Sequence, residues 1–239
     1  MHFPPRLPPA IAFLAMLVSM TGAAFAGGGA TVPTATAGEL RIVAFGSSST
    51  QGVGASTPAH SYPSMLQIDL EAALPNGIAP TVVNLGHGGD DSEEMTAKIS
   101  SVLAQHPDLV IWQTGTNDPL RGLPLDRFVA LTEAGLDAFR AAHVQVMLIE
   151  PQFCRALADH PEALGYRDSL RRVARERGLP IVRRYDLMQE WLAQGIVSET
   201  QLQSGDGLHM GDGGYALLAQ YITRLIVPTT GRPALVATR

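Results

Sequence analysis

The sequence predicts a doubly wound α/β domain on a parallel sheet of about five strands, and two observations support this prediction. Short apolar runs occur at residues 41–45, 80–85, 108–113, 144–149 and 180–183. They are apolar throughout instead of alternating with polar residues, as expected for strands that are covered on both faces. Longer segments of helical period separate the runs, and helices that cross between parallel strands provide this cover.

The predicted helices are recognised by apolar residues that recur three and four positions apart. Segments with this period lie at about residues 65–74, 99–103, 125–142, 160–177 and 212–226. In a doubly wound sheet the functional loops gather at the carboxyl ends of the strands. We therefore expect the loops after residues 45, 85, 113 and 149 to face one another, together with the loop before the last helix.

The first 26 residues have the features of a signal peptide. A short basic segment precedes an apolar run from Ala10 to Ala26, which ends in the small-x-small pattern of a cleavage site before Gly27. A retained membrane anchor is the alternative, but the run is roughly 17 residues long and is interrupted by polar residues, whereas a span needs roughly 20. We expect an exported protein, periplasmic or secreted, with no membrane anchor after cleavage. It would consist of a linker at residues 27–38, a domain at 39–227 and a tail at 228–239.

Composition excludes several functions. With 17 basic and 22 acidic residues the chain has a net charge of −5, which argues against nucleic acid as a partner. Cys154 is the only cysteine, so no disulfide can form within the chain, and it is most simply a small buried hydrophobic residue. Lys98 is the only lysine, which excludes a phosphate-loop lysine, a Schiff base and a Ser-Lys dyad. We interpret Arg167, Arg171 and Arg175 as a solvated helix face and not as a site for a polyanion.

Hydroxyl groups and an Asp-x-x-His pair could form a nucleophile and its base. The block Gly46-Ser47-Ser48-Ser49-Thr50 follows the first predicted strand, where the start of a helix favours developing negative charge. Asp206 precedes His209 by three residues, close enough to hold the imidazole in the tautomer that a general base needs. A surface capping arrangement is the simpler interpretation of this pair taken alone.

Two further loops could stabilise an oxyanion. The block ending in Gly88 and Gly89 offers unobstructed backbone N–H groups, and Asn117 offers a side-chain amide. Each block is also an ordinary turn by itself, and Asp91 with Glu94 fits a helix N-terminal cap. A metal site formed by His87, Asp90 and Asp91 is conceivable, but the acidic residues fit the start of a helix better. The joint occurrence of all four blocks at the predicted strand ends favours a catalytic site.

The ordered blocks FGSSSTQG, NLGHGGDD, TGTND and DGLH resemble those of the SGNH, or GDSL-type, serine hydrolases, from about Arg41 to Ile226. The resemblance implies a three-layer α/β/α sandwich with a flavodoxin-like sheet, and cleavage of carboxylic esters without a metal or organic cofactor. It also implies site residues, carried over position by position. These are Ser48, Asp206 and His209 as the catalytic triad, with the backbone N–H groups of Ser48 and Gly89 and the side chain of Asn117 as oxyanion donors.

The nucleophile block departs from the family pattern at two positions. Ser47 replaces the aspartate that precedes the family's nucleophile, and Ser49 replaces the aliphatic residue that follows it. Because the replaced aspartate is not the triad acid, the reaction remains possible. The hydrogen bonds that aim the hydroxyl are then different, and Ser47 and Ser49 remain alternative nucleophiles.

The function that we expect is hydrolysis of acyl or acetyl esters through an acyl-enzyme, acting on a small-molecule or glycan ester. A carbohydrate or cell-wall glycan O-deacetylase using the same site is the enzymatic alternative. A non-catalytic glycan-binding module on the same fold is the alternative of another class. The nucleotide-binding interpretation fails, since Gly46 and Gly52 enclose five residues with no lysine after them.

Overall fold

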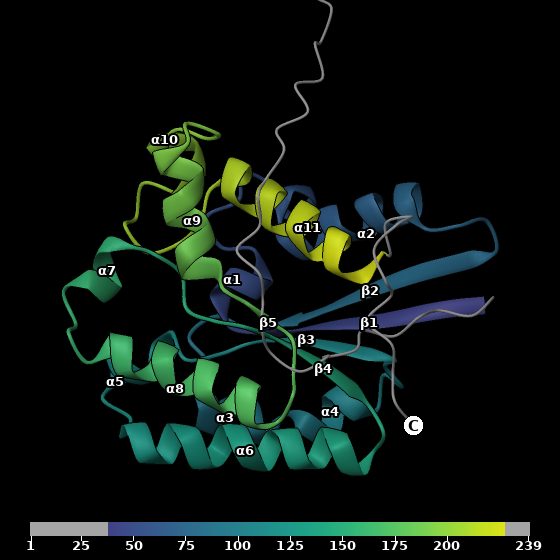
Figure 1. The fold of residues 1–239 in the computed structure, drawn as a ribbon, viewed down its shortest axis with the longest axis horizontal. Coiled ribbons are helices and arrows are strands. Elements are labelled where there is room, and N and C mark those ends of the chain that lie inside the picture. The colour runs from purple at the N-terminus through teal and green to yellow at the C-terminus, as the bar shows by residue number, and fades with distance from the viewer. Residues whose placement is uncertain (1–37, 228–239) are drawn as a thin grey trace, which may run out of the picture.

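The computed structural model describes residues 38–227, which form a central sheet between two layers of helices (Figure 1). The predicted signal peptide and tail, and all but the last residue of the predicted linker, lie outside the described residues. The strands are β1 (Gly38–Gly46), β2 (Ile78–Gly86), β3 (Leu109–Gln113), β4 (Gln145–Ile149) and β5 (Ile181–Val182). All pair in parallel, and their order is β2-β1-β3-β4-β5. The predicted fold class is therefore confirmed.

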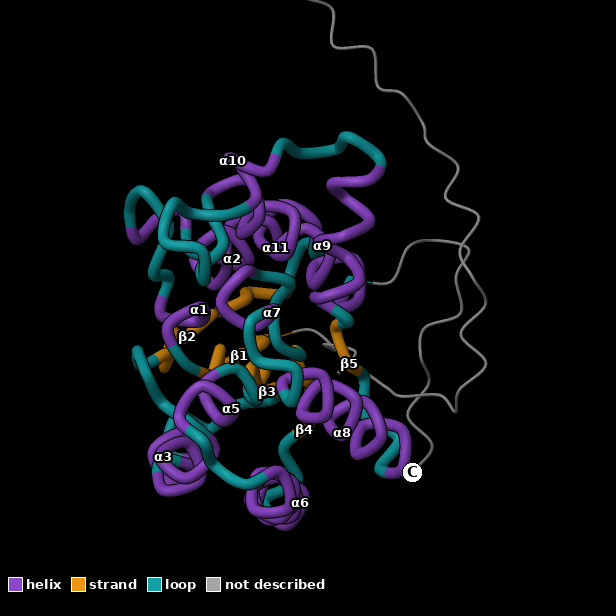
Figure 2. The backbone as a smooth tube through the Cα atoms, turned by 90° about the vertical axis from the view of Figure 1, so that its left-hand side faces the viewer, coloured by secondary structure: helices purple, strands orange, loops and turns teal. Residues whose placement is uncertain are grey.

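The strand order places a topological switch point between β1 and β3. The chain leaves β1 toward β2 on one side and returns to β3 on the other, so the loops after β1 and β3 diverge at neighbouring strand ends. The registers Gly46↔Gly86 and Phe45↔Trp112 bring these ends to one edge of the sheet. Figure 2 looks onto this edge, around which α1 (Ser48–Gln51), α5 (Asn117–Arg121) and α7 (Arg155–Ala158) gather.

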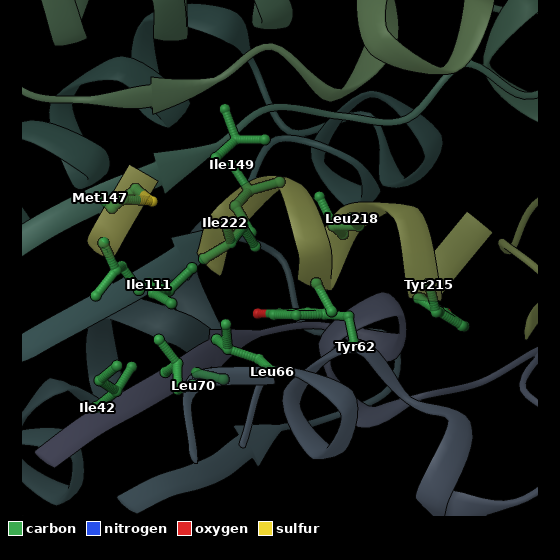
Figure 3. Packing of buried hydrophobic residues seen from close by; sticks show 14 of the residues in the cluster. Ile42, Tyr62, Leu66, Leu70, Ile111, Met147, Ile149, Tyr215, Leu218 and Ile222 are labelled. Atoms are coloured by element: carbon green, nitrogen blue, oxygen red, sulfur yellow. The ribbon is translucent and has the colours of Figure 1, made fainter. Parts of the chain in front are cut away.

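One face of the sheet is covered by α2 (Tyr62–Ala73), α9 (Arg184–Ala193) and α11 (Asp212–Ile226). Alternate side chains of β1, β3 and β4 pack here against apolar residues of α2 and α11, as Figure 3 shows. Among the buried members of this cluster are Ile42, Leu66, Leu70, Ile111, Met147, Ile149, Leu218 and Ile222. Since the strands are buried on both faces, the intervening residues form a second cluster on the opposite face.

The opposite face is covered by α3 (Ser92–Ala97), α4 (Ile99–Leu103), α6 (Leu125–Ala141) and α8 (Ala163–Glu176). Trp112 lies at the centre of this cluster, against Phe45 and Phe139 at ring-centroid distances of 5.7 and 5.8 Å. The helical segment predicted at residues 99–103 forms as α4, and Lys98 separates it from α3. The short helices η1 (Pro58–His60) and α10 (Glu199–Leu202) complete the described chain.

The interpretation of the arginine series as a solvated face is wrong for two of its members. Arg171 donates through Nη2 to Glu150 Oε1 at 2.7 Å and to Asp186 at 2.9 Å, and the Glu150 side chain is fully buried. The Arg167 guanidinium lies 4.6 Å from the ring centroid of Tyr185. Both arginines thus tie α8 to the start of α9, a tertiary contact that helical spacing alone could not predict.

Among residues 38–227, none of the helices has the length and apolar character needed to cross a membrane.

Candidate active site

The nucleophile block forms a tight turn at the end of β1. β1 ends at Gly46, and α1 begins two residues later at Ser48. A Cβ atom on Gly46 would lie 2.4 Å from Thr50 Oγ1, and one on Gly86 would lie 2.1 Å from the backbone nitrogen of Gln51. Only glycine at these two positions lets α1 pack directly on the ends of the strands. This packing fixes the backbone that carries Ser48.

Ser48, His209 and Asp206 form a continuous series of hydrogen bonds. Ser48 Oγ lies 2.7 Å from His209 Nε2, and His209 Nδ1 lies 2.6 Å from Asp206 Oδ2. The neighbouring serines face elsewhere. Ser47 Oγ donates to Gln113 Oε1 at 3.1 Å, and Ser49 is buried beside Tyr215. Of the three serines, Ser48 is therefore the one that contacts the histidine.

The loop that carries Asp206 and His209 is closed by local hydrogen bonds. Ser204 N donates to the carbonyl of His209 at 2.9 Å, and Gln203 pairs with Met210 in an isolated antiparallel bridge. Within the loop, Asp206 Oδ1 accepts from the backbone N–H groups of Leu208 and His209, each at 2.9 Å, and from Ser204 Oγ at 2.7 Å. The carboxylate therefore folds its own loop as well as orienting the imidazole.

The Asp206 carboxyl is held in its ionised form. Partial burial tends to raise its pKa, but the hydrogen bonds from the His209 and Leu208 backbone, the Ser204 hydroxyl and the His209 ring outweigh this effect. The net result is a pKa well below the usual range for aspartate. An ionised Asp206 keeps a proton on His209 Nδ1 and leaves Nε2 free to accept the proton of Ser48.

The glycine block after β2 approaches Ser48. A Cβ atom on Gly88 would lie 2.9 Å from Gln51 Oε1 and 3.9 Å from Ser48 Cβ. Gly89 has a φ of +85°, a conformation that favours glycine, and open space where its side chain would be. The Gly89 carbonyl accepts from Arg121 Nη1 at 3.1 Å. Arg121 thus fastens this loop to α5, the helix that Asn117 begins.

Asn117 contacts the same loop from the other side. Its Nδ2 donates to the backbone carbonyl of Asp90 at 2.8 Å, and its side chain is almost fully buried. Asp90 is also buried, and its carboxylate lies against His87 Nδ1 at 2.7 Å and against Lys98. The predicted helix cap is present as a capping box formed by Asp91 and Glu94. Within residues 38–227, no three His, Cys, Asp or Glu side chains lie close enough together to bind a metal ion.

Several buried polar side chains lie behind these loops and were not predicted from the sequence. Gln113, Gln152 and Arg184 are completely buried and hydrogen-bonded next to site residues. Gln113 leaves one signal in the sequence, because it is the only polar residue of the otherwise apolar β3. Gln152 and Arg184 leave none, since they lie in a loop and at the start of a helix, where polar residues are usual.

Comparison with known proteins shows the family to which this fold belongs. The model of the "Non-GDSL lipase-like family" matches residues 30–231, which is most of the chain. The chain belongs to this family, and its resemblance to the SGNH/GDSL-type hydrolases, a group of carboxylic ester hydrolases, is confirmed. The description "non-GDSL" agrees with the run Gly46-Ser47-Ser48-Ser49, which differs from Gly-Asp-Ser-Leu at its second and fourth positions.

Three relatives illustrate the similarity. An arylesterase of Vibrio mimicus is 42% identical over 65 residues, covering 27% of this chain and 31% of that protein, so the match spans less than a third of its length. The crystal structure of a lipase/acylhydrolase from Enterococcus faecalis has 25% identity and a TM-score of 0.67, covering 78% of this chain and 95% of the other. An acetyl-xylooligosaccharide esterase mutant from Geobacillus has 20% identity and a TM-score of 0.66, with coverages of 81% and 96%, and shows similarity of fold alone.

Proposed function

We propose that this protein is a serine esterase that hydrolyses carboxylic esters through an acyl-enzyme intermediate. The observation that carries the proposal is the 2.7 Å contact between Ser48 Oγ and His209 Nε2, with Asp206 hydrogen-bonded to the opposite nitrogen of the ring. This geometry has a hydroxyl, a base and an orienting carboxylate in the order that nucleophilic catalysis requires.

In the first half-reaction His209 Nε2 accepts the proton of Ser48 Oγ as the oxygen attacks the ester carbonyl carbon. The tetrahedral intermediate then collapses, the bond to the alcohol oxygen breaks, and His209 returns the proton to the departing alcohol. In the second half-reaction a water molecule attacks the acyl-enzyme with His209 again acting as base. Ser48 recovers its proton and the carboxylic acid leaves.

Three donors are proposed to stabilise the oxyanion. The backbone N–H of Ser48 lies at the start of α1, that of Gly89 belongs to the glycine loop, and Asn117 supplies its side-chain amide. Asn117 Nδ2 carries two hydrogens, one of which bonds to the Asp90 carbonyl. The other is available to a substrate, and the Asp90 contact limits the directions in which it can point.

The substrate is proposed to be an ester of a small molecule or of a glycan. A glycan O-deacetylase would use the same residues, with acetyl as the acyl group. Export to the periplasm or the medium, proposed from the features of residues 1–26, is compatible with either substrate. A series of p-nitrophenyl esters from acetyl to long acyl chains, assayed beside acetate release from acetylated xylan, distinguishes the two.

The test is substitution of each of the three serines by alanine. We expect Ser48→Ala to abolish turnover of p-nitrophenyl acetate and labelling by a fluorophosphonate probe, which reacts with an activated serine. Ser47→Ala and Ser49→Ala are matched controls that should still be labelled. Wild-type turnover by Ser48→Ala would overturn the assignment, and failure of the unmodified protein to react with any ester or with the probe would favour a binding module.

A further inference from the structure

Four buried polar side chains form a connected chain behind the proposed catalytic residues. Gln113 ends β3, Thr116 precedes α5, Gln152 follows β4, and Arg184 begins α9. None of them is more than 3% exposed. We refer to Gln113, Thr116, Gln152 and Arg184 as the buried polar chain.

Hydrogen bonds link the four members in sequence. Arg184 Nη2 donates to Gln152 Oε1 at 2.6 Å, and Thr116 Oγ1 donates to the same oxygen at 3.2 Å. Gln113 Nε2 donates to Thr116 Oγ1 at 3.3 Å. Thr116 is therefore the link that joins the two glutamines.

The buried polar chain contacts residues that immediately precede the proposed catalytic residues. Gln113 Oε1 accepts from the backbone N–H of Ser47 at 3.0 Å and from its hydroxyl at 3.1 Å. Gln152 Nε2 donates to the backbone carbonyl of Leu208 at 3.1 Å. Ser47, Thr116 and Leu208 are each followed directly by a site residue, namely Ser48, Asn117 and His209.

The groups at the ends of the chain determine the orientation of both amides. A guanidinium can only donate, so Gln152 must turn Oε1 toward Arg184 and Nε2 toward the Leu208 carbonyl, which can only accept. The Thr116 hydroxyl donates its hydrogen to Gln152, so it accepts a hydrogen bond from Gln113. This leaves Gln113 Oε1 facing the Ser47 N–H, which can only donate. Every bond agrees with one direction of donation, as expected of a cooperative network.

Arg184 anchors the chain as a buried cation. Its Nε donates to the backbone carbonyl of Glu150 at 3.0 Å, and its side chain is completely shielded from solvent. Burial lowers the pKa of the guanidinium to about 10, so the group remains protonated at neutral pH. A charged donor gives stronger hydrogen bonds than a neutral one, which fixes Gln152 in place.

We propose that the buried polar chain is a positioning network that sets the relative placement of Ser48, Asn117 and His209. The proposal rests on the proposed function and deepens it, because it names the residues that replace the family's aspartate in aiming the hydroxyl. None of the four residues touches the reacting atoms. Displacement of a reacting group by about 1 Å can lower the rate on the order of 10²-fold, so a network that holds three loops together affects kcat.

Thr116→Val is the most selective test, because valine matches threonine in shape and removes only the hydroxyl that joins the two glutamines. We expect kcat for p-nitrophenyl acetate to fall on the order of 10- to 10²-fold with little change in KM. Thr116→Ser keeps the hydroxyl and should restore most of kcat. Thr114→Val is the matched control, since Thr114 is buried two residues earlier and its hydroxyl has no hydrogen-bond partner within residues 38–227. It should retain wild-type kcat.

A second variant keeps the test decisive if Thr116→Val does not fold. Gln152→Glu retains an acceptor for Arg184 and Thr116 but sets a carboxylate oxygen against the Leu208 carbonyl. We expect a similar loss of kcat and slower fluorophosphonate labelling, while Thr114→Val labels at the wild-type rate. Wild-type kcat in folded Thr116→Val or Gln152→Glu would overturn the positioning role, as would equal losses in Thr116→Ser and Thr116→Val. Neither result would bear on the proposed esterase function, which is tested separately by Ser48→Ala and by the reaction of the unmodified protein with esters and with the fluorophosphonate probe.

Discussion

The side-chain amide of Asn117 and the backbone carbonyl of Asp90 are joined by a 2.8 Å hydrogen bond. It connects the loop after β3 with the loop after β2, the two loops proposed to supply oxyanion donors beside Ser48. An amide nitrogen has two hydrogens, so the same group can hold the neighbouring loop and also bind a developing oxyanion. The bond therefore restricts where the second hydrogen points before any substrate arrives.

Asn117→Ala is expected to lower kcat on the order of 10²- to 10³-fold, the usual effect of removing one oxyanion donor. KM should change less, because the interaction strengthens as charge develops on the oxygen. Steady-state kinetics with p-nitrophenyl acetate measure both constants. Asn76→Ala, at an exposed turn residue, is the control and should behave as wild type. A fall in kcat of less than about threefold in Asn117→Ala would remove Asn117 from the proposed oxyanion site.

The sequence predicted the proposed catalytic residues better than it predicted the buried polar residues that hold them in place. Ser48 and His209 are 161 positions apart, yet the strand pattern was sufficient to bring them to the same sheet edge, because parallel strands leave few topologies open. Arg184 was not recognised, since a cation at the start of a helix is usually exposed. Its burial depends on acceptors at Glu150 and Gln152, which follow a different strand, and local spacing carries no information about them.

Ser47→Asp restores the aspartate of the family pattern and is nevertheless expected to reduce activity. Ser47 faces Gln113 Oε1, and a carboxylate there would oppose a second acceptor. Rotating the Gln113 amide would relieve this repulsion only by leaving the Ser47 N–H without its acceptor. We expect kcat to fall on the order of 10-fold or more from the displacement of Ser48. Ser47→Ala keeps the hydrogen bond from the Ser47 backbone N–H and should lose much less of its kcat. Equal kcat in Ser47→Asp and wild type would contradict the orientation of the Gln113 amide.

Asp206→Asn is expected to lower kcat on the order of 10³- to 10⁴-fold without removing the side chain. The asparagine amide would donate toward His209 Nδ1, which favours the tautomer with its proton on Nε2, so that the ring cannot accept the proton of Ser48. Kinetics combined with a fluorophosphonate labelling rate measure this loss. Asp159→Asn, in which the substituted residue lies on the surface at the end of α7, is the control and should retain kcat.

The low pKa of Asp206 also predicts how stability depends on pH. The pKa of the Asp206 carboxyl is lower in the folded than in the unfolded state, where it is about 3.9. Such a carboxyl stabilises the fold at pH values above its unfolded-state pKa. This contribution is lost as pH falls from there through the folded pKa. The difference in Tm between wild type and Asp206→Asn should thus be constant from pH 7 to about 5 and shrink below about pH 4. A difference that grows as the pH falls would contradict the direction of the shift.

Lys98→Met tests how the glycine loop is held, because Lys98 is the only lysine and pairs with the buried carboxylate of Asp90. Within the described part of the chain the substitution leaves that carboxylate with His87 as its side-chain partner, and it should cost about 1–3 kcal/mol of unfolding free energy, measured by urea denaturation. Arg127→Met breaks an exposed pair with Glu93 and should cost less than about 1 kcal/mol. Adding Asp90→Asn to Lys98→Met removes the unpaired charge and should recover part of the loss. If the losses of the two single variants simply add in the double variant, or if the double variant loses more than their sum, the favourable pairing that the structure indicates is contradicted.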